Sequence, residues 1–287
     1  FTSADTAITK GRTLDTGTAS YTFKNAIAKD TILFAVQGFE ANIADFVTLS
    51  GSVGFRSDGT GFTAVGRNMS ATLAGGSVAS LSVTDGAFGL SVAAGETAFE
   101  LSANNFQFRI GGLPDAKADT VFLRYTSAEK TVAKGEKLSV AGVSYTFAEP
   151  IAKDTVAFSF TGFRTAISDV LSLSGGLGFA KAGGDLIGVG SAMNASVRAG
   201  DAASVSATDG SFGLIVNDSG AAFELRGGFS ATIGGLIGAK ADRTVVQHAS
   251  SGMSIAAGRR IAIGAASYTF QQAIAAGLPD ALSNFSF

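Results

Sequence analysis

The chain has 287 residues, 15% of them charged, and a formal net charge of −2, so it lacks the basic field that holds nucleic acid. It has no cysteine and a single histidine, His248, which excludes disulfides and argues against transition-metal sites and histidine-based catalytic triads. Glycine and polar residues interrupt the long uncharged stretch Ile261–Pro279, so we predict no membrane-spanning segment.

The first predicted element is a β-hairpin that ends in the tetrapeptide SYTF. Its sequence, GRTLDTGTASYTF, alternates apolar and polar residues around a glycine-containing turn, which is typical of two short paired strands. The tyrosine and the phenylalanine are two residues apart and therefore share one face of the strand. Two later segments, GEKLSVAGVSYTF and GRRIAIGAASYTF, repeat the pattern. We expect each hairpin to pack its aromatic face into the core of its own unit; the residues are Tyr21, Phe23, Tyr145, Phe147, Tyr268 and Phe270.

Long strands separated by short breaks follow the first hairpin. Breaks such as SDGTG and AAGE have the length of hairpin turns, which predicts antiparallel neighbours. Several strands carry a glycine or an Asp-Gly near the middle, a signal for bulges and bends. We therefore predict an all-β fold in which long, centrally bent strands form an antiparallel β-sandwich or β-roll. The expected strands lie near 31–39, 46–56, 61–74, 77–93, 97–110 and 118–125, with Phe55, Phe88, Phe99 and Phe108 as core residues.

The whole pattern then repeats at an offset of 124 residues (145 − 21). The peptides IAKDT, TDG and AFEL recur at that spacing, which indicates a tandem duplication. We predict two repeat units, residues 1–124 (unit one) and 125–247 (unit two), and a partial third unit over 248–287 (the stub). The stub keeps its hairpin and then diverges, so it is either a truncated copy or a shortened variant.

Carboxylates are the only candidates for chemistry. Asp85 and Asp209 in the repeated TDG, and Asp185 after two glycines, are weak candidates for calcium ligands. Turn chemistry explains the same residues without a ligand, because aspartate before glycine bends a chain at low cost. Glu100 and Glu224 alternate with apolar residues and are expected on a polar strand face; a glycosidase would need one of them in a cleft beside an aspartate. We predict no catalytic or cofactor-binding residue.

The sequence resembles the tandem-repeat regions of large secreted bacterial surface proteins. The resemblance rests on the SYTF hairpin, followed by LSG-x-x-GF, AVG or GVG, and FGL. Such regions belong to adhesin-like and matrix-like proteins, often exported by type I systems, and the resemblance implies an extracellular, non-enzymatic spacer, fibre, sheath, filament or surface layer. We expect the partners to be copies of the chain itself or neighbouring repeats. The stub either joins copies head-to-tail through an incomplete terminal sheet or is a cut inside a longer array of repeats. The alternative is a module that binds calcium or a cell-surface glycan.

Overall fold

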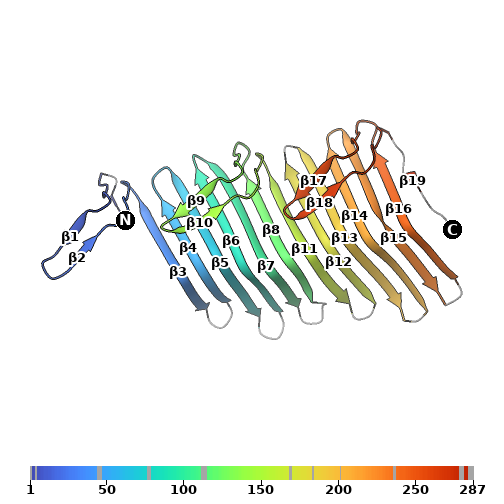
Figure 1. The fold of residues 1–287 in the computed structure, drawn as a ribbon, viewed down its shortest axis with the longest axis horizontal. Coiled ribbons are helices and arrows are strands. Elements are labelled where there is room, and N and C mark those ends of the chain that lie inside the picture. The colour runs from blue at the N-terminus through green and yellow to red at the C-terminus, as the bar shows by residue number, and fades with distance from the viewer. Residues whose placement is uncertain are drawn as a thin grey trace.

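The structure is a computed structural model that describes residues 2–3, 5–43, 47–75, 79–110, 115–167, 170–182, 184–200, 202–234, 237–277 and 281–283. These residues are all-β and contain no helix, and most of them belong to one large antiparallel sheet (Figure 1). The expected all-β class and the antiparallel pairing are thus confirmed.

The main sheet has 13 strands in the order β19-β16-β15-β14-β13-β12-β11-β8-β7-β6-β5-β4-β3. Strands that follow one another in sequence are neighbours in space, as the short breaks predicted, except where a hairpin intervenes. The strands are β3 (Ile32–Ile43), β4 (Val47–Ser57), β5 (Gly61–Gly75), β6 (Ala79–Ala93), β7 (Glu96–Ile110), β8 (Ala116–Thr126), β11 (Val156–Ile167), β12 (Leu171–Ala182), β13 (Asp185–Ala199), β14 (Ala203–Asn217), β15 (Gly220–Ile233), β16 (Ile237–Ala249) and β19 (Ala281–Ser283).

Each SYTF segment forms a separate two-stranded hairpin. The strand pairs are β1 (Thr13–Asp15) with β2 (Ser20–Thr22), β9 (Lys137–Val140) with β10 (Val143–Thr146), and β17 (Arg260–Ile263) with β18 (Ala266–Thr269). Hairpin β9–β10 contacts β4, β5 and β6, and hairpin β17–β18 contacts β12, β13 and β14. Figure 1 shows β1–β2 lying beyond β3, away from the sheet.

The main sheet runs without interruption across the expected boundary between the units. Strand β8 pairs with β11 from Tyr125↔Val156 to Ala116↔Thr165. The described residues therefore show neither a sandwich nor a roll within each unit, and the only second layer is a hairpin over part of each half. The physical reason is that β8 and β11 use their facing edges to pair with each other, so the sheet continues sideways across the junction.

A row of β-bulges bends the strands near their middles. The pairing register shifts between Gly66 and Met69 in β5, and at corresponding points in the other long strands. At these points Asp85 and Asp209 adopt positive φ angles of 51° and 50°. A bulge places one extra residue in a strand and strengthens its bend, and aspartate tolerates the left-handed conformation that this requires. The predicted central bends are therefore bulges.

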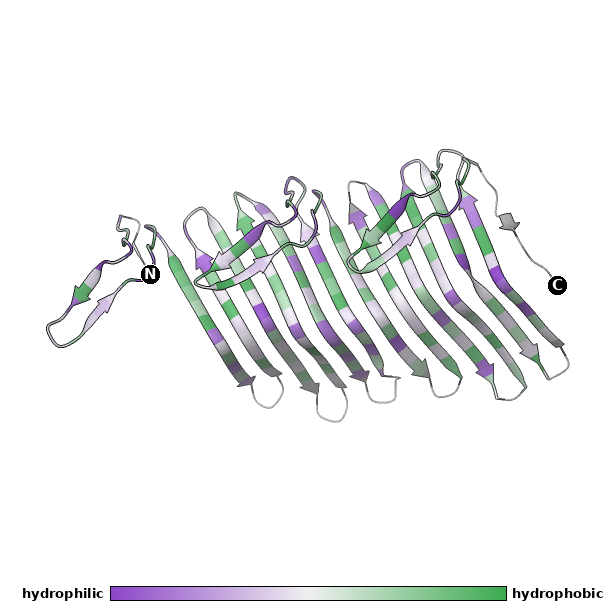
Figure 2. Cartoon of the chain, viewed as in Figure 1, coloured by the Kyte–Doolittle hydropathy of each residue, from purple (hydrophilic) through white to green (hydrophobic). Residues whose placement is uncertain are grey.

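The two faces of the sheet differ. We call the side that carries the hairpins the hairpin face and the other side the open face. Successive side chains along a strand point to opposite faces. Figure 2 shows hydrophobic and hydrophilic residues interspersed along the strands. On the open face, the rings of Phe88 and Phe212 lie where side chains at Gly66 and Gly190 would stand, so each ring covers a neighbouring glycine.

The expected core is only partly correct. Phe55 and Phe108 each keep an exposed fraction of 37%, and Phe88 and Phe99 are partly buried. Among the described residues the open face carries no second layer, so Phe34, Phe55 and Phe62 pack against one another, and Phe88 and Phe212 pack over neighbouring glycines. The register links one residue per strand into a single row that crosses the sheet from β3 to β16: Val36, Val53, Gly66, Phe88, Leu101, Leu123, Phe158, Phe179, Gly188, Leu214, Phe223 and His248.

Candidate functional site

The most elaborate site of the described residues lies beneath each docked hairpin. In unit one, Tyr145 and Phe147 are buried, with exposed fractions of 8% and 0%. They share a hydrophobic cluster with Val65 and Ala98 of the unit-one strands. The expectation that an SYTF hairpin packs into its own unit is therefore wrong, because this hairpin belongs to unit two and packs on unit one.

Glycines on the hairpin face make room for the hairpin. A Cβ atom at Gly89 would lie 2.5 Å from the ring of Tyr145, and one at Gly54 would lie 2.8 Å from Cβ of Val140. Only glycine allows this close approach of hairpin and sheet. Burial of Phe147 alone contributes on the order of 2 kcal/mol to hairpin docking.

Unit two repeats the arrangement with the hairpin of the stub. Gly213 lies beneath Tyr268, with a Cβ position 2.4 Å from the ring, and Gly178 lies beneath Ile263. Phe270 is fully buried in a second cluster that includes Ile215 of β14. Each of these two docked hairpins thus lies on main-sheet strands that precede it in sequence.

A buried glutamate lies at the bottom of the first site. Glu100 has an exposed fraction of 2%. It accepts a hydrogen bond from the Tyr145 hydroxyl at 2.6 Å and forms an ion pair with Arg124, whose Nε lies 2.7 Å away. The expectation of a solvated polar face is wrong for this residue, because its face of β7 is the one that the hairpin covers. A buried carboxylate is tolerated here because it is paired and hydrogen-bonded.

The second site keeps the same chemistry with a rearranged arginine. Glu224 is fully buried and accepts hydrogen bonds from Tyr268, Arg226 and the backbone N–H of Gln271. It also accepts one from the side chain of Gln247. At an offset of 123 or 124 residues, Gln247 corresponds to Arg124 and Arg226 corresponds to Ser102.

The arginine that pairs with the glutamate therefore lies on β8, the last strand, in unit one, but on β15, the fifth strand, in unit two. Arg124 reaches Glu100 from the opposing residue of the neighbouring strand, whereas Arg226 reaches Glu224 from two residues along the same strand. Both positions lie on the hairpin face beside the glutamate. In the sequence, the two differences are a glutamine at 247 where unit one has Arg124 and an arginine at 226 where unit one has Ser102. Only the pairing of strands shows that both positions lie beside the same glutamate.

The hydrogen bonds also set the ionisation of the second site. Burial by itself would raise the pKa of Glu224, but hydrogen bonds from Arg226, Tyr268 and Gln247 outweigh burial and hold the pKa at about 2. Burial, together with the hydrogen bond to the glutamate, raises the pKa of Tyr268 well above its ordinary value, and the same causes act on Tyr145. The phenols therefore stay protonated donors and the Glu224 carboxylate stays an anion across the neutral range.

The first hairpin has no such site beneath it. Tyr21 has an exposed fraction of 60%, and Phe23 is partly buried. Of the six aromatic residues singled out in the sequence, four therefore lie in docked hairpins, and two lie in the hairpin β1–β2, which Figure 1 shows beyond β3.

The aspartates suggested as calcium ligands lie apart. Asp85 and Asp209 are bulge residues of β6 and β14, which are six strands apart, or roughly 29 Å at the usual strand spacing. Asp185 accepts a hydrogen bond from the side chain of Asn217. Within the described residues, no group of three or more His, Cys, Asp or Glu side chains is placed to hold a metal ion.

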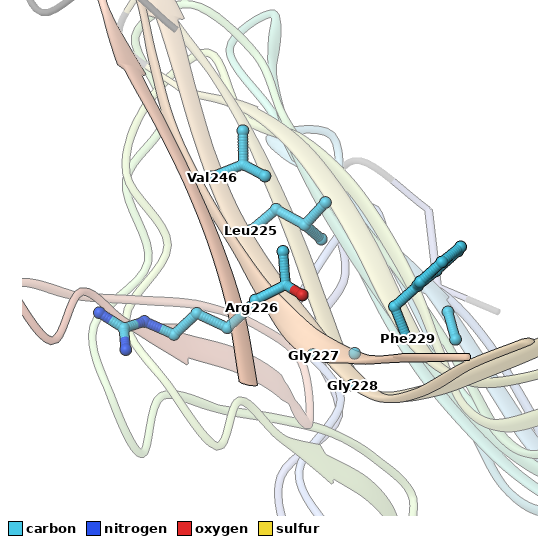
Figure 3. Close-up of a pocket in the computed structure, with 9 residues that line it drawn as sticks. Leu225, Arg226, Gly227, Gly228, Phe229 and Val246 are labelled. Atoms are coloured by element: carbon cyan, nitrogen blue, oxygen red, sulfur yellow. The ribbon is translucent and has the colours of Figure 1, made fainter. Parts of the chain in front are cut away.

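A small apolar hollow lies on the open face at the row of bulges. Its volume is about 270 Å³, and the glycine pair Gly227–Gly228 forms its floor. Figure 3 shows Leu225 and Phe229 projecting to one side of the strand and Arg226 to the other, toward the glutamate site. The atoms that line the hollow are almost all apolar, although Arg226 is one of the residues around it.

Comparison with known proteins adds no relative: no protein-family model, curated protein or solved structure matches the chain. The fold and the site define the class of protein: an all-β chain with one large antiparallel sheet, onto which two hairpins dock through buried clusters of glutamate, tyrosine and arginine. Among the described residues, no helix has the length and the apolar character needed to cross a bilayer.

Proposed function

We propose that the chain is a non-enzymatic structural repeat protein of a bacterial cell surface, part of an extracellular fibre, sheath, surface layer or adhesin stalk. In this proposal residues 1–124 and 125–247 are tandem copies and residues 248–287 are a partial third. Each copy adds six strands to one continuous sheet and sends its hairpin back onto the copy before it.

The observation that carries the proposal is the junction between the two units. There, strand pairing joins β8 to β11, and the hairpin β9–β10 docks on the preceding strands at the same time. Two segments joined both by strand pairing and by a hairpin that reaches back onto the preceding strands resist bending against each other, as a spacer or stalk requires. Repeat proteins of this kind gain length in one dimension, because each unit contacts only its neighbours.

The length of the molecule tests the proposal. Six strands add about 29 Å to the sheet at the usual spacing of strands. A chain that carries one extra copy of residues 125–247 ahead of Phe1 should therefore show a maximum dimension about 29 Å longer by small-angle X-ray scattering. A compact particle, or two units that tumble independently, would contradict the proposal. Antibody labelling of intact cells that make the protein tests its surface location.

A second candidate, adhesion to a glycan, is favoured by the open face. The exposed rings of Phe34 and Phe55 stack there with centroids 6.3 Å apart, and the exposed Phe158 ring lies tilted against the partly buried Phe179 ring, with centroids 5.6 Å apart. Exposed aromatic rings can pack against the apolar faces of sugars. The test is a glycan array with the wild-type chain and the variant Phe55→Ser/Phe158→Ser; absence of any signal with the wild type removes this candidate.

A further inference from the structure

The three hairpins have the same internal structure. In each, the glycine at the start donates its N–H to the carbonyl of the closing phenylalanine, at 2.8, 2.8 and 2.7 Å for Gly11, Gly135 and Gly258. In each, the tyrosine and phenylalanine rings meet edge to face with centroids 5.2 or 5.3 Å apart. The hairpin β1–β2 thus presents the shape of a docked hairpin while Tyr21 and Leu14 remain exposed.

The residues that anchor each hairpin to the preceding unit also recur. Ser127 exchanges hydrogen bonds with Thr97 at the start of β7, and Ser250 does the same with Ala221 in β15. Ser3 occupies the corresponding position, and its hydroxyl contacts Thr6 instead. The first hairpin therefore carries the anchoring serine but has no strand beside it to hold.

The edge of strand β3 lies beside the hairpin β1–β2 and, in the part of the chain that the structure describes, is also left without a partner strand on that side. It is the last strand of the main sheet on its side, whereas its counterpart β11 pairs with β8. An edge strand offers unpaired backbone groups to another strand. In the described residues, β3 and β1–β2 together leave open the two contacts that β11 and β9–β10 make with unit one.

A second copy of the same chain does not supply the missing half. The hairpin face of unit one is occupied by β9–β10 and that of unit two by β17–β18, so both Glu100 and Glu224 already have a tyrosine partner. The occupant must instead bring a free hairpin face with an unpartnered glutamate.

We propose that hairpin β1–β2 and the edge of β3 form a docking surface for one further repeat unit of this design. That unit is a six-stranded antiparallel sheet with glycines at the positions of Gly54 and Gly89 and a glutamate at the position of Glu100. Its last strand pairs with β3, and its glutamate accepts a hydrogen bond from Tyr21. This inference rests on the proposed structural function and names the partner that extends the sheet.

The first test asks whether the first hairpin can occupy a docking site at all. Residues 258–270 and 11–23 have equal length and both run from glycine to SYTF. The full chain with residues 258–270 replaced by the sequence of residues 11–23 should keep this hairpin docked on unit two. The expected result is amide hydrogen-exchange protection of the graft within about tenfold of the wild-type hairpin. Loss of protection would overturn the proposal, because the sequence would lack the ability to dock.

The second test supplies the missing unit. In the fusion with an extra copy of residues 125–247 ahead of Phe1, residues 11–23 remain unique in sequence and can be followed separately. Their exchange should slow by more than about tenfold relative to the wild-type chain. The matched control is the same fusion with Tyr21→Ala, in which protection of the hairpin should be lost.

The outcomes of these experiments distinguish failure of the inference from failure of the proposed function. Unchanged exchange of residues 11–23 in a fusion that has grown in length would refute hairpin docking and leave the spacer function intact. A fusion that does not lengthen would refute the spacer function itself. Concentration-dependent dimers of the wild-type chain that Tyr21→Ala abolishes, seen by analytical ultracentrifugation, would make a second copy the occupant and refute the partner named here.

Discussion

Tyr268 donates a hydrogen bond to Glu224, a residue 44 positions earlier in the chain. Both groups are buried, and the contact joins the hairpin of the stub to the sheet of unit two. Tyr145 and Glu100 make the same connection between the two full units. The docking of each of these two hairpins therefore includes a buried tyrosine–glutamate hydrogen bond, and single substitutions can test its contribution.

Removal of the Tyr268 hydroxyl should destabilise the docked hairpin. Tyr268→Phe leaves Glu224 short of one donor, and loss of a hydrogen bond to a buried charged group costs about 2 kcal/mol. Urea denaturation followed by circular dichroism measures the free energy of unfolding. The matched control is Tyr21→Phe, which removes the same atom from an exposed side chain and should change this free energy by less than about 0.5 kcal/mol. Equal effects of the two substitutions would contradict the assigned role of Glu224.

An arginine on either of the two neighbouring strands should stabilise the buried glutamate. Arg124→Gln leaves Glu100 buried without its cation and should destabilise unit one by about 3 kcal/mol. Adding Ser102→Arg, which copies the arrangement of Arg226 and Gln247, should restore more than half of the loss. Urea denaturation of both single variants and the double variant gives the coupling energy directly. Additive effects without recovery would show that the exchange is not compensatory.

The stability of the stub hairpin should fall in acid. The pKa of Glu224 is about 2 in the folded chain, against an ordinary value of 4.5, so its carboxylate contributes stability above pH 4.5. That contribution is lost as the pH falls from 4.5 toward 2. Hydrogen exchange of residues 258–270 across this range should show progressive loss of protection, and Glu224→Gln should reduce the slope. Identical pH profiles for wild type and variant would exclude Glu224 as the titrating group.

The same hairpin should also loosen in strong base. The pKa of Tyr268 is raised above its ordinary value of 10.0, so the protonated phenol contributes stability that is complete below pH 10. This stability is lost as the pH rises through the folded-state pKa. The ultraviolet absorbance of tyrosinate should show Tyr268 and Tyr145 ionising well above pH 10, and Tyr268→Phe should remove one of these late transitions. Ionisation of both near pH 10 would contradict their burial.

A side chain at a docking-site glycine should release the hairpin without disrupting the sheet. Gly213→Val places a Cβ within 2.4 Å of the Tyr268 ring, which the hairpin cannot accommodate in place. The expected result is exposure of Tyr268, measured by hydrogen exchange of residues 258–270, with the protection of β13 and β14 largely retained. Gly238→Val is the matched control, because nothing lies within 4 Å of a Cβ at Gly238. Retained hairpin protection in Gly213→Val would contradict the close approach.

Much of the architecture could be predicted from local sequence. Alternating apolar residues, short Gly-containing breaks and mid-strand signals such as Asp85–Gly86 predict long antiparallel strands with central bends, because turn and bulge chemistry depends on residues close in the chain. The three SYTF hairpins follow from the same local rules. These features require no knowledge of which distant segments meet.

Only the tertiary structure decided where each hairpin packs and that Glu100 and Glu224 are buried partners of the hairpin tyrosines. Alternation in the AFEL peptide places the glutamate opposite its apolar neighbours, but it does not say that a hairpin from the next unit covers that face. The same applies to the sandwich expected in each unit, since strand period is identical whether a sheet folds over or grows sideways. Those choices depend on contacts between residues more than 40 positions apart, such as Tyr145 with Glu100, and on strand edges that pair across the repeat boundary.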